Sequence, residues 1–534
     1  MAVSFVAILI VACGMALLAK RLRLPYTVVL VVAGLIVSAL SAAGQLGLNL
    51  KLTPELLLQL FLPILLFEAA FHVDLKSFLN NKRAILFLAI PGVIVGMLLT
   101  TGLFMAVGEL FSLGFSWQLV LLAAAMLAAT DPISVVALFK EFTVSKRLGI
   151  IIEGESLIND GIAVVIFAVV VKITSAQLGL TLPHLDTAES LQAMTVVLDF
   201  LREVLLGTAI GLGIGLGISY LTSKFDDQHI EVALTVIAAY GANVAAMELH
   251  ASGVIAVVVC GMMIGNVGVK HGMSPTTREE VVSFWEFAAF VANSFVFILI
   301  GLEIELAGLW EQAVPIVLFF VIMILVRAVT VFGVHGLVRR ADLRLKQEWL
   351  PVITWAGVRG SLSMVLAMML LVSAKGEAGT AAEANRLVLL NIVYGVVLMS
   401  ILLQGTTMAW LMKSKGLIIE TPEETEYELA LARRQAIRAL LENMESSERK
   451  GTLSHETFEA LHRQLLARRV ANDKRIAQML EHTPTLNTIE LKIESAHLSA
   501  LEKQIYRDLE KAGDLDYDSM EALVREVVDR GKGR

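Results

Sequence analysis

Charged residues and cysteines are both scarce in this chain of 534 residues. Only 17% of the residues are charged, against about a quarter in an average soluble domain. This scarcity excludes an ordinary soluble globular protein as the class of the whole chain. The two cysteines, Cys13 and Cys260, lie in apolar runs, so they imply neither a disulfide framework nor a metal site. The modest net charge of −7 gives no reason to expect a nucleic-acid partner.

Long apolar runs are what the chain has in abundance, with 56% hydrophobic residues and a mean hydropathy of +0.74. A helix needs about 20 mostly apolar residues to cross a bilayer. We therefore predict an all-α polytopic membrane protein with about 13 transmembrane helices. The segments lie at approximately 2–19, 25–43, 54–72, 84–108, 117–139, 148–172, 197–222, 230–248, 252–268, 282–302, 312–337, 349–373 and 386–412.

The distribution of basic residues predicts the orientation of these segments. Alternate loops carry sixteen Lys and Arg residues in one set and five in the other. Because basic loops remain on the cytoplasmic side, we expect the N-terminus outside and the C-terminus inside. No basic residue precedes the first apolar run, so we expect that run to be a retained span and not a signal peptide. The inner or plasma membrane is the predicted location.

The composition changes near Lys413, after which charged residues are dense. We predict two domains: residues 1–415 form a transmembrane domain, and residues 416–534 form a cytosolic helical region. The cluster Arg433, Arg434 and Arg438 near the membrane exit suggests a regulatory role for this region, through a lipid or a partner. No catalytic motif is evident in it, and we expect neither an enzyme nor a cofactor.

Two transmembrane segments are interrupted. Pro132 removes a backbone donor and clashes with the carbonyl one turn back, so the helix through Thr130 and Asp131 should open. The run Gly357-Val358-Arg359-Gly360-Ser361 predicts a second break, in segment twelve. Broken helices in corresponding positions of two halves are typical of inverted-repeat transporters that bind substrate near the membrane midplane. Segments one to six and eight to thirteen supply such halves.

Segment seven is rich in glycine, with Gly207, Gly211, Gly213, Gly215 and Gly217. A nucleotide-binding loop would need G-x-G-x-x-G spacing and a preceding strand, and the segment has neither. Small residues four apart in a membrane helix instead favour close packing against another helix.

The segment Glu153–Gly161 places three carboxylates inside an apolar run, where ionisable groups usually mark an ion or proton pathway. Ser156 and Asp160 are four apart and share a helix face. Glu155 faces about 140° away from Asp160, toward some other partner. Arg327 is alone in its own apolar run, and a buried Arg usually pairs with a carboxylate. We therefore predict a structural Glu155–Arg327 ion pair.

Asp160 is then free for chemistry. A buried carboxylate must be neutralised by a proton or by a metal cation, and competition between the two is sufficient for exchange. Oxygen ligands from Asp131, Thr130, Ser156 and the opened backbone suit a small monovalent cation, whereas soft or nitrogen ligands for a transition metal are missing. The ligand set at Asp160 and Asp131 therefore predicts a small monovalent cation.

Two further residues have alternative interpretations. Glu68 could be a third ligand, a gate residue or an acid at the membrane interface. Arg359 could shape the potential of the site or hold the broken segment together, and we favour the second.

The same residues resemble the monovalent cation:proton antiporters of the NhaP and eukaryotic sodium–proton exchanger type. The matching motifs are Ala129-Thr130-Asp131-Pro132, Glu153-Gly154-Glu155-Ser156-Leu157-Ile158-Asn159-Asp160, Arg327 in its span, and Gly357-Val358-Arg359-Gly360. The resemblance covers about residues 1–415.

The resemblance implies a homodimer of thirteen-span chains. Segments four to six and eleven to thirteen would form a core that moves past a dimerisation scaffold. The family's ligands map onto Asp160, Asp131, Thr130, Ser156 and, by its span, Glu68. By the same resemblance we place Na⁺ at Asp160 and Asp131 and count Asn159 among the residues that bind the cation or the proton. Asn159 beside Asp160 is also the form that the family associates with electroneutral exchange.

The expected function is therefore exchange of Na⁺, or of K⁺ or Li⁺, for H⁺ in a one-to-one ratio by alternating access. A channel or a sensor that keeps a transporter-like site is the competing class. Nothing in the chain resembles a selectivity filter, which disfavours a channel. An organic-anion transporter is a second rival, disfavoured because the site has acidic ligands and few basic ones.

Overall fold

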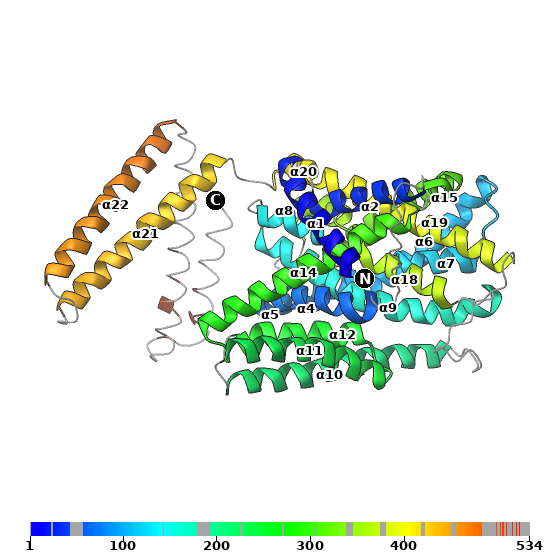
Figure 1. Ribbon diagram of the computed structural model, residues 1–534, viewed down its shortest axis with the longest axis horizontal. Coiled ribbons are helices and arrows are strands. Elements are labelled where there is room, and N and C mark those ends of the chain that lie inside the picture. Colours follow the sequence, from blue (N-terminus) through cyan, green and yellow to red (C-terminus); the bar gives the residue numbers. More distant parts are fainter. Residues whose placement is uncertain are drawn as a thin grey trace. The chain divides into compact units, whose positions relative to one another are not determined.

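The computed structural model describes residues 2–22, 25–42, 57–141, 144–178, 193–224, 227–269, 272–304, 306–337, 345–373, 381–417, 422–449 and 455–482, with single residues beyond 482. Every regular element in these ranges is helical, which confirms the predicted all-α class (Figure 1). The chain divides into two compact units, Met1–Ile418 and Ile419–Arg534.

The first unit contains the apolar helices. They are α1 (Ala2–Leu22), α2 (Tyr26–Ala42), η1 (Leu57–Phe61), α4 (Leu62–His72), α5 (Leu75–Ala89), α6 (Pro91–Leu110), α7 (Trp117–Met126), α8 (Ile133–Glu141), α9 (Lys146–Leu178), α10 (Ala193–Thr222), α11 (Gln228–Glu248), α12 (Gly253–Met263), η2 (Ile264–Gly268), α14 (Pro275–Glu303), α15 (Leu306–Glu311), α16 (Ala313–Leu337), η3 (Gln347–Trp349), α17 (Leu350–Trp355), α18 (Ser361–Ser373), α19 (Ala381–Met399), η4 (Ser400–Gln404) and α20 (Gly405–Ser414).

Seven helical stretches among the described residues are long and apolar enough to cross a membrane, and six shorter apolar helices accompany them. Together these stretches overlap every one of the predicted segments. The number of membrane crossings stays a prediction, because the shorter helices lack the length of a full span.

Both predicted breaks are present. α7 ends at Met126, and the chain runs without helix until α8 begins at Ile133. Likewise, α17 ends at Trp355 and α18 begins at Ser361. The two interruptions meet, since the Asp131 N–H donates to the Val358 carbonyl at 2.7 Å. The fold thus brings two stretches of unwound backbone together inside the helical bundle.

The glycines of α10 permit a close approach to α12. A Cβ atom at Gly207 would lie 2.8 Å from a backbone oxygen just before α12, and one at Gly215 would lie 3.1 Å from a backbone oxygen within it. Gly211, between them, is similarly close to the α12 backbone, whereas Gly213 and Gly217 face open space. α10, α11 and α12 run side by side (Figure 1). The glycine run is a packing surface, as its spacing predicts.

The π-helical turns η1, η2 and η4 were not predicted from the sequence. A π-turn inserts one extra residue into an α-helical register, and its formation depends on the surrounding packing. The fourth predicted segment is also longer than expected, because α5 and α6 form one stretch interrupted only at Ile90, before Pro91.

The second unit contains a pair of antiparallel helices, α21 (Pro422–Arg449) and α22 (His455–His482). Tyr427, Ala430 and Ile476 pack in one small apolar cluster between them. The buried Asn472 side chain donates to the Ala430 carbonyl at 2.8 Å. The helical character of the whole region 416–534, its cytosolic location and its role stay predictions.

Candidate functional site

A cavity of about 510 Å³ opens beside the crossing of the two breaks. Its walls come from α4, α9, α14, the break before α8 and the start of α18. Eight of the residues singled out in the sequence line this cavity: Glu68, Thr130, Asp131, Pro132, Glu153, Ser156, Asp160 and Gly360. Residues from four separate parts of the chain therefore meet at one hollow.

Asp131 stands at the beginning of α8, where Pro132 prevents the helix from continuing backwards. Its Oδ1 accepts a hydrogen bond from the Ile133 N–H at 3.0 Å. Its Oδ2 is buried and has no hydrogen-bond partner among the described residues. Gly360 makes room for this carboxylate, because a Cβ atom there would overlap the Asp131 side chain.

Asp160 lies on α9, one turn beyond Ser156. Its Oδ1 is the second carboxylate oxygen at the cavity that is buried without a hydrogen-bond partner in the described part of the chain. Burying such an oxygen without compensation is costly. A hard cation with oxygen ligands provides that compensation, so the donor set fits a bound Na⁺.

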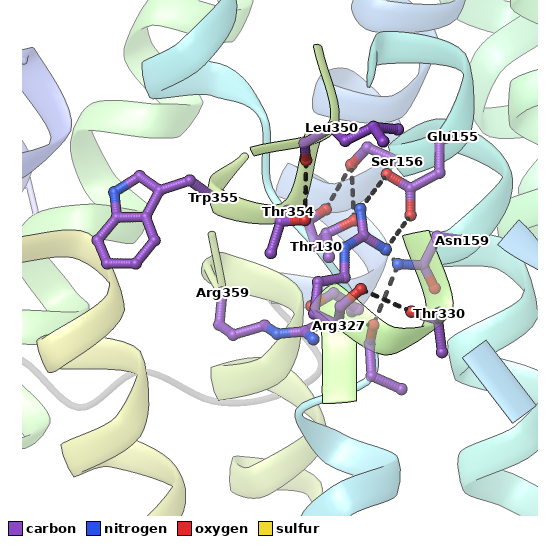
Figure 2. Close-up of polar contacts among 12 residues, drawn as sticks. Thr130, Glu155, Ser156, Asn159, Arg327, Thr330, Leu350, Thr354, Trp355 and Arg359 are labelled. Carbon is purple, nitrogen blue, oxygen red and sulfur yellow. Dashed lines mark hydrogen bonds and ion pairs between the residues drawn. The ribbon is translucent and has the colours of Figure 1, made fainter. Parts of the chain in front are cut away.

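Thr130 and Ser156 are tied together next to these carboxylates. The Ser156 hydroxyl donates to the Thr130 carbonyl at 2.5 Å, and the Thr130 hydroxyl donates to Ser156 Oγ at 3.3 Å (Figure 2). Both side chains are almost fully buried. These hydrogen bonds fix the two neutral oxygens that the sequence predicts as ligands between the unwound backbone and α9.

Asn159 is placed differently from its neighbour Asp160. Its Nδ2 donates to the Ala128 carbonyl at 3.1 Å and to Thr130 Oγ1 at 2.9 Å (Figure 2). Asn159 does not line the cavity that Asp160 lines. The structure therefore puts Asn159 behind the break as a support for Thr130, and does not bring it to the cavity as a direct ligand.

Glu155 and Arg327 form a bidentate ion pair between α9 and α16. Arg327 Nη1 and Nη2 donate to Glu155 Oε1 and Oε2, each at 2.8 Å (Figure 2). The Glu155 side chain is only 3% exposed and that of Arg327 10%. Bidentate Arg–carboxylate geometry fixes orientation as well as charge, so the pair ties α16 to the helix that carries Asp160. Gly357 lies against it, since a Cβ atom there would be 3.1 Å from Arg327 Nε.

Arg359 lies in the second break, and its side chain makes hydrogen bonds to the backbone of the first break. Its Nη1 donates to the carbonyls of Ala128 and Ala129 at 2.6 and 3.0 Å. These carbonyls follow the end of α7, where helical carbonyls lack partners and a cation is favourable. This geometry matches the favoured role of Arg359 as a support for the broken segments.

Two residues of η4 complete this support and were missed in the sequence. The Arg359 N–H donates to Ser400 Oγ at 2.8 Å, and Gln404 Nε2 donates to the Trp355 carbonyl at 3.0 Å. Ser400 and Gln404 also bond to each other. Both are polar residues four apart in an apolar run, which is the signal that could have identified them.

The mouth of the cavity has further polar residues. His72 Nδ1 lies 3.4 Å from Glu68 Oε1, and His72 Nε2 lies 4.0 Å from Glu286 Oε1. Glu286 and Asn293 come from α14 and line the cavity opposite the broken helices. They are seven apart and share a helix face, a spacing that could have identified them in the sequence.

This arrangement defines a class of protein: a helical membrane transporter with an ion site at two crossed, broken helices. A family model described as "Sodium/hydrogen exchanger, transmembrane" matches residues 6–414. The chain belongs to this sodium/hydrogen exchanger family.

Known relatives match over nearly the whole chain. The Na⁺/H⁺ antiporter ApNhaP of Aphanothece halophytica is 35% identical over 98% of this chain and 96% of its own length. The low-affinity Na⁺/H⁺ antiporter NhaS1 of Synechocystis is 33% identical over 98% and 95%. A solved structure of the sodium proton antiporter MjNhaP1 from Methanocaldococcus jannaschii is 18% identical, covers 78% of this chain and 98% of its own, and has a TM-score of 0.63. At that identity it supports the fold alone.

Proposed function

We propose that this protein is a secondary active antiporter that exchanges Na⁺ for H⁺ at the cavity. Membership of the exchanger family supports this function, as do the relatives named as Na⁺/H⁺ antiporters. The observation that carries the proposal is the pair of buried, unpartnered carboxylate oxygens of Asp131 and Asp160 at one cavity. The family consists of transporters, and the proposed mechanism needs no enzymatic step and no cofactor.

Asp160 is the proposed point of competition between the two ions. When Na⁺ binds, its charge offsets that of the carboxylate, and the hydroxyls of Thr130 and Ser156 with Asp131 supply further oxygen ligands. When Na⁺ leaves, a proton takes over the neutralisation of Asp160. The ionised and empty carboxylate is the least favourable state in a low-dielectric environment, so the site moves across the membrane when loaded.

The finer features of transport follow from this scheme as parts of the proposal. One carboxylate that exchanges one Na⁺ for one H⁺ makes the cycle electroneutral. Access alternates between the two sides as the broken-helix core moves relative to the rest of the bundle. K⁺ and Li⁺ have the same ligand chemistry and are the alternative cations.

The protein's setting is also proposed. The distribution of basic residues places the N-terminus outside and residues 416–534 in the cytosol, in an inner or plasma membrane. The chain functions as a homodimer surrounded by membrane lipids, and the C-terminal region regulates it through a lipid or a partner.

Purified protein in proteoliposomes with an imposed pH gradient tests the function. Addition of Na⁺ should collapse the gradient, and Asp160→Asn should abolish this while the variant stays folded. Asp199→Asn is a matched control, because Asp199 is exposed on α10 and should keep wild-type exchange. Full exchange by Asp160→Asn would overturn the assignment of Asp160.

The membrane potential separates electroneutral exchange from its rivals. With the potential clamped by K⁺ and valinomycin, the rate should be independent of the potential. A potential that drives Na⁺ movement without a pH gradient would refute electroneutrality, and single-channel conductance would favour a channel instead.

A further inference from the structure

A second hollow lies behind the crossing of the broken helices. It has a volume of about 40 Å³ and is lined by residues of α6, α7, α9, α16 and the second break. Asn159, Arg327, Arg359, Thr100 and Thr330 supply its polar lining, and the rest is apolar. It shares no lining residue with the large cavity. We call this hollow the rear chamber.

The rear chamber is lined by polar groups that lack hydrogen-bond partners. Asn159 is completely buried, and its Oδ1 has no donor among the residues that the structure describes. Its Nδ2 is already engaged by the Ala128 carbonyl and Thr130 Oγ1, so the amide cannot rotate without losing both bonds. Arg327 Nε is likewise buried without an acceptor in the described part of the chain. Two of the residues that line the hollow thus carry one leftover acceptor and one leftover donor.

The charges around the rear chamber favour a neutral occupant. Arg327 is neutralised by the bidentate contact with Glu155. Arg359 donates to backbone carbonyls and belongs to the region that also contains Asp131 and Asp160. Both guanidinium groups are therefore already engaged and offer an anion little attraction, while the described lining of the chamber has no acidic side chain to attract a cation. A neutral molecule that both donates and accepts hydrogen bonds satisfies both leftover groups.

We propose that the rear chamber is a binding site for water. A bound water needs about 10–15 Å³ and two to four polar partners, so the chamber has room for about three molecules. One water donates a hydrogen bond to Asn159 Oδ1. Water in the chamber also hydrates Arg327 on the side of the guanidinium group that does not contact Glu155. Without that donor the Asn159 carbonyl bears an uncompensated desolvation cost.

The water also has a consequence for the cation site, and this step rests on the proposed function. Asn159 Nδ2 donates to Thr130 Oγ1, which in turn donates to Ser156 Oγ at the large cavity. Asn159 is therefore a positioning residue that lies between the hydrated chamber and the cation ligands. Loss of the water loosens Thr130 and raises the KM for Na⁺ more than it lowers kcat.

X-ray hydroxyl-radical footprinting of the purified protein tests for the water directly. Met323 lines the rear chamber and is 5% exposed, whereas Met126 on α7 is 0% exposed and lines neither hollow. Radicals formed from bound water oxidise an adjacent thioether, so Met323 should be oxidised about tenfold faster than Met126. Equal protection of both methionines would overturn the proposal, whatever the result of any transport assay.

Filling the chamber provides the matched comparison. A Cβ atom at Gly96 would be 4.0 Å from side-chain carbons of Thr330 and Val326, so Gly96→Val places methyl groups in the chamber without backbone overlap. Gly102→Val is the control on the same helix, because nothing lies within 4 Å of its Cβ position. Gly96→Val should reduce Met323 oxidation and raise the KM for Na⁺, whereas the control Gly102→Val should change neither. If Gly96→Val leaves Met323 oxidation unchanged, the occupant is not water. If the thermal stability of the wild-type protein depends on chloride, the occupant is an anion and not water. If Gly96→Val does not fold, the wild-type footprint decides.

Discussion

The buried pair between Glu155 and Arg327 allows a quantitative prediction. Replacing Arg327 with Met removes both 2.8 Å hydrogen bonds and leaves the Glu155 carboxylate buried without its counter-charge. Removing one partner of a buried pair typically costs about 3–5 kcal/mol. With roughly 2 °C per kcal/mol for a large domain, the Tm of Arg327→Met should fall by about 6–10 °C.

A substitution of the partner residue Glu155 and the double variant complete a double-mutant thermodynamic cycle. Glu155→Leu should destabilise by a similar amount, because it leaves Arg327 buried and uncompensated. An apolar pair of similar volume often costs little compared with the original ion pair. The double variant Glu155→Leu/Arg327→Met should therefore be more stable than either single variant.

Thermal melting monitored by size-exclusion chromatography in detergent measures all four proteins. A coupling free energy of about 3 kcal/mol or more between the two positions is expected for residues in direct contact at a buried pair. Additive losses in the double variant, or an unchanged Tm for Arg327→Met, would refute the reasoning that this pair holds α9 to α16.

Three further predictions concern other parts of the molecule. Gly360→Ala should abolish proteoliposome exchange and cost about 1–3 kcal/mol or more, because the new methyl group overlaps Asp131. Gly211→Leu should lower the Tm by forcing α10 away from α12, and a wild-type Tm would contradict the close contact. The hydrogen bond that His455 Nδ1 donates to the Glu448 carboxylate raises the pKa of His455, so this contact stabilises the α21–α22 pair below the unfolded pKa and is lost as pH rises through the raised value. Hydrogen exchange of these helices in the full chain should therefore show less protection at high pH, and His455→Gln should remove that dependence.

The parts of the fold that the sequence predicts correctly are those with a local physical cause. Pro132 cannot continue a helix whatever surrounds it, so the first break is evident from the residue itself. Arg327 is alone in an apolar run and needs a carboxylate, and Glu155 faces away from Asp160. Gly207, Gly211 and Gly215 of α10 are four residues apart, which places these three on one packing face.

The predicted role of Asn159 did not take into account which side of α9 this residue occupies. Asn159 is adjacent to Asp160, and the sequence-based prediction counts it among the residues that bind the cation or the proton. Helix geometry indicates otherwise, because Asn159 is four residues after Glu155 and shares its face, while Ser156 and Asp160 share another. The structure follows that periodicity, with Glu155 and Asn159 behind the break and Ser156 and Asp160 at the cavity.

The π-turn η4 and the rear chamber depend on tertiary packing and lack a local signal, although the spacing of the two polar residues in η4 is itself visible in the sequence. The π-turn η4 brings Ser400 and Gln404 to the second break, and its extra residue per turn cannot be recognised from composition or periodicity. The rear chamber is a gap between four helices and a break, so no short stretch of sequence could predict it.

The central claim is that one carboxylate, Asp160, is contested by Na⁺ and H⁺. Isothermal titration of the purified protein with NaCl, in two buffers of different ionisation enthalpy, measures how many protons leave when Na⁺ binds. At a pH where Asp160 is protonated, the account predicts close to one proton released per Na⁺ bound, and neither binding nor release for Asp160→Asn. Na⁺ binding without proton release across the pH range, or unchanged release in Asp160→Asn, would contradict it.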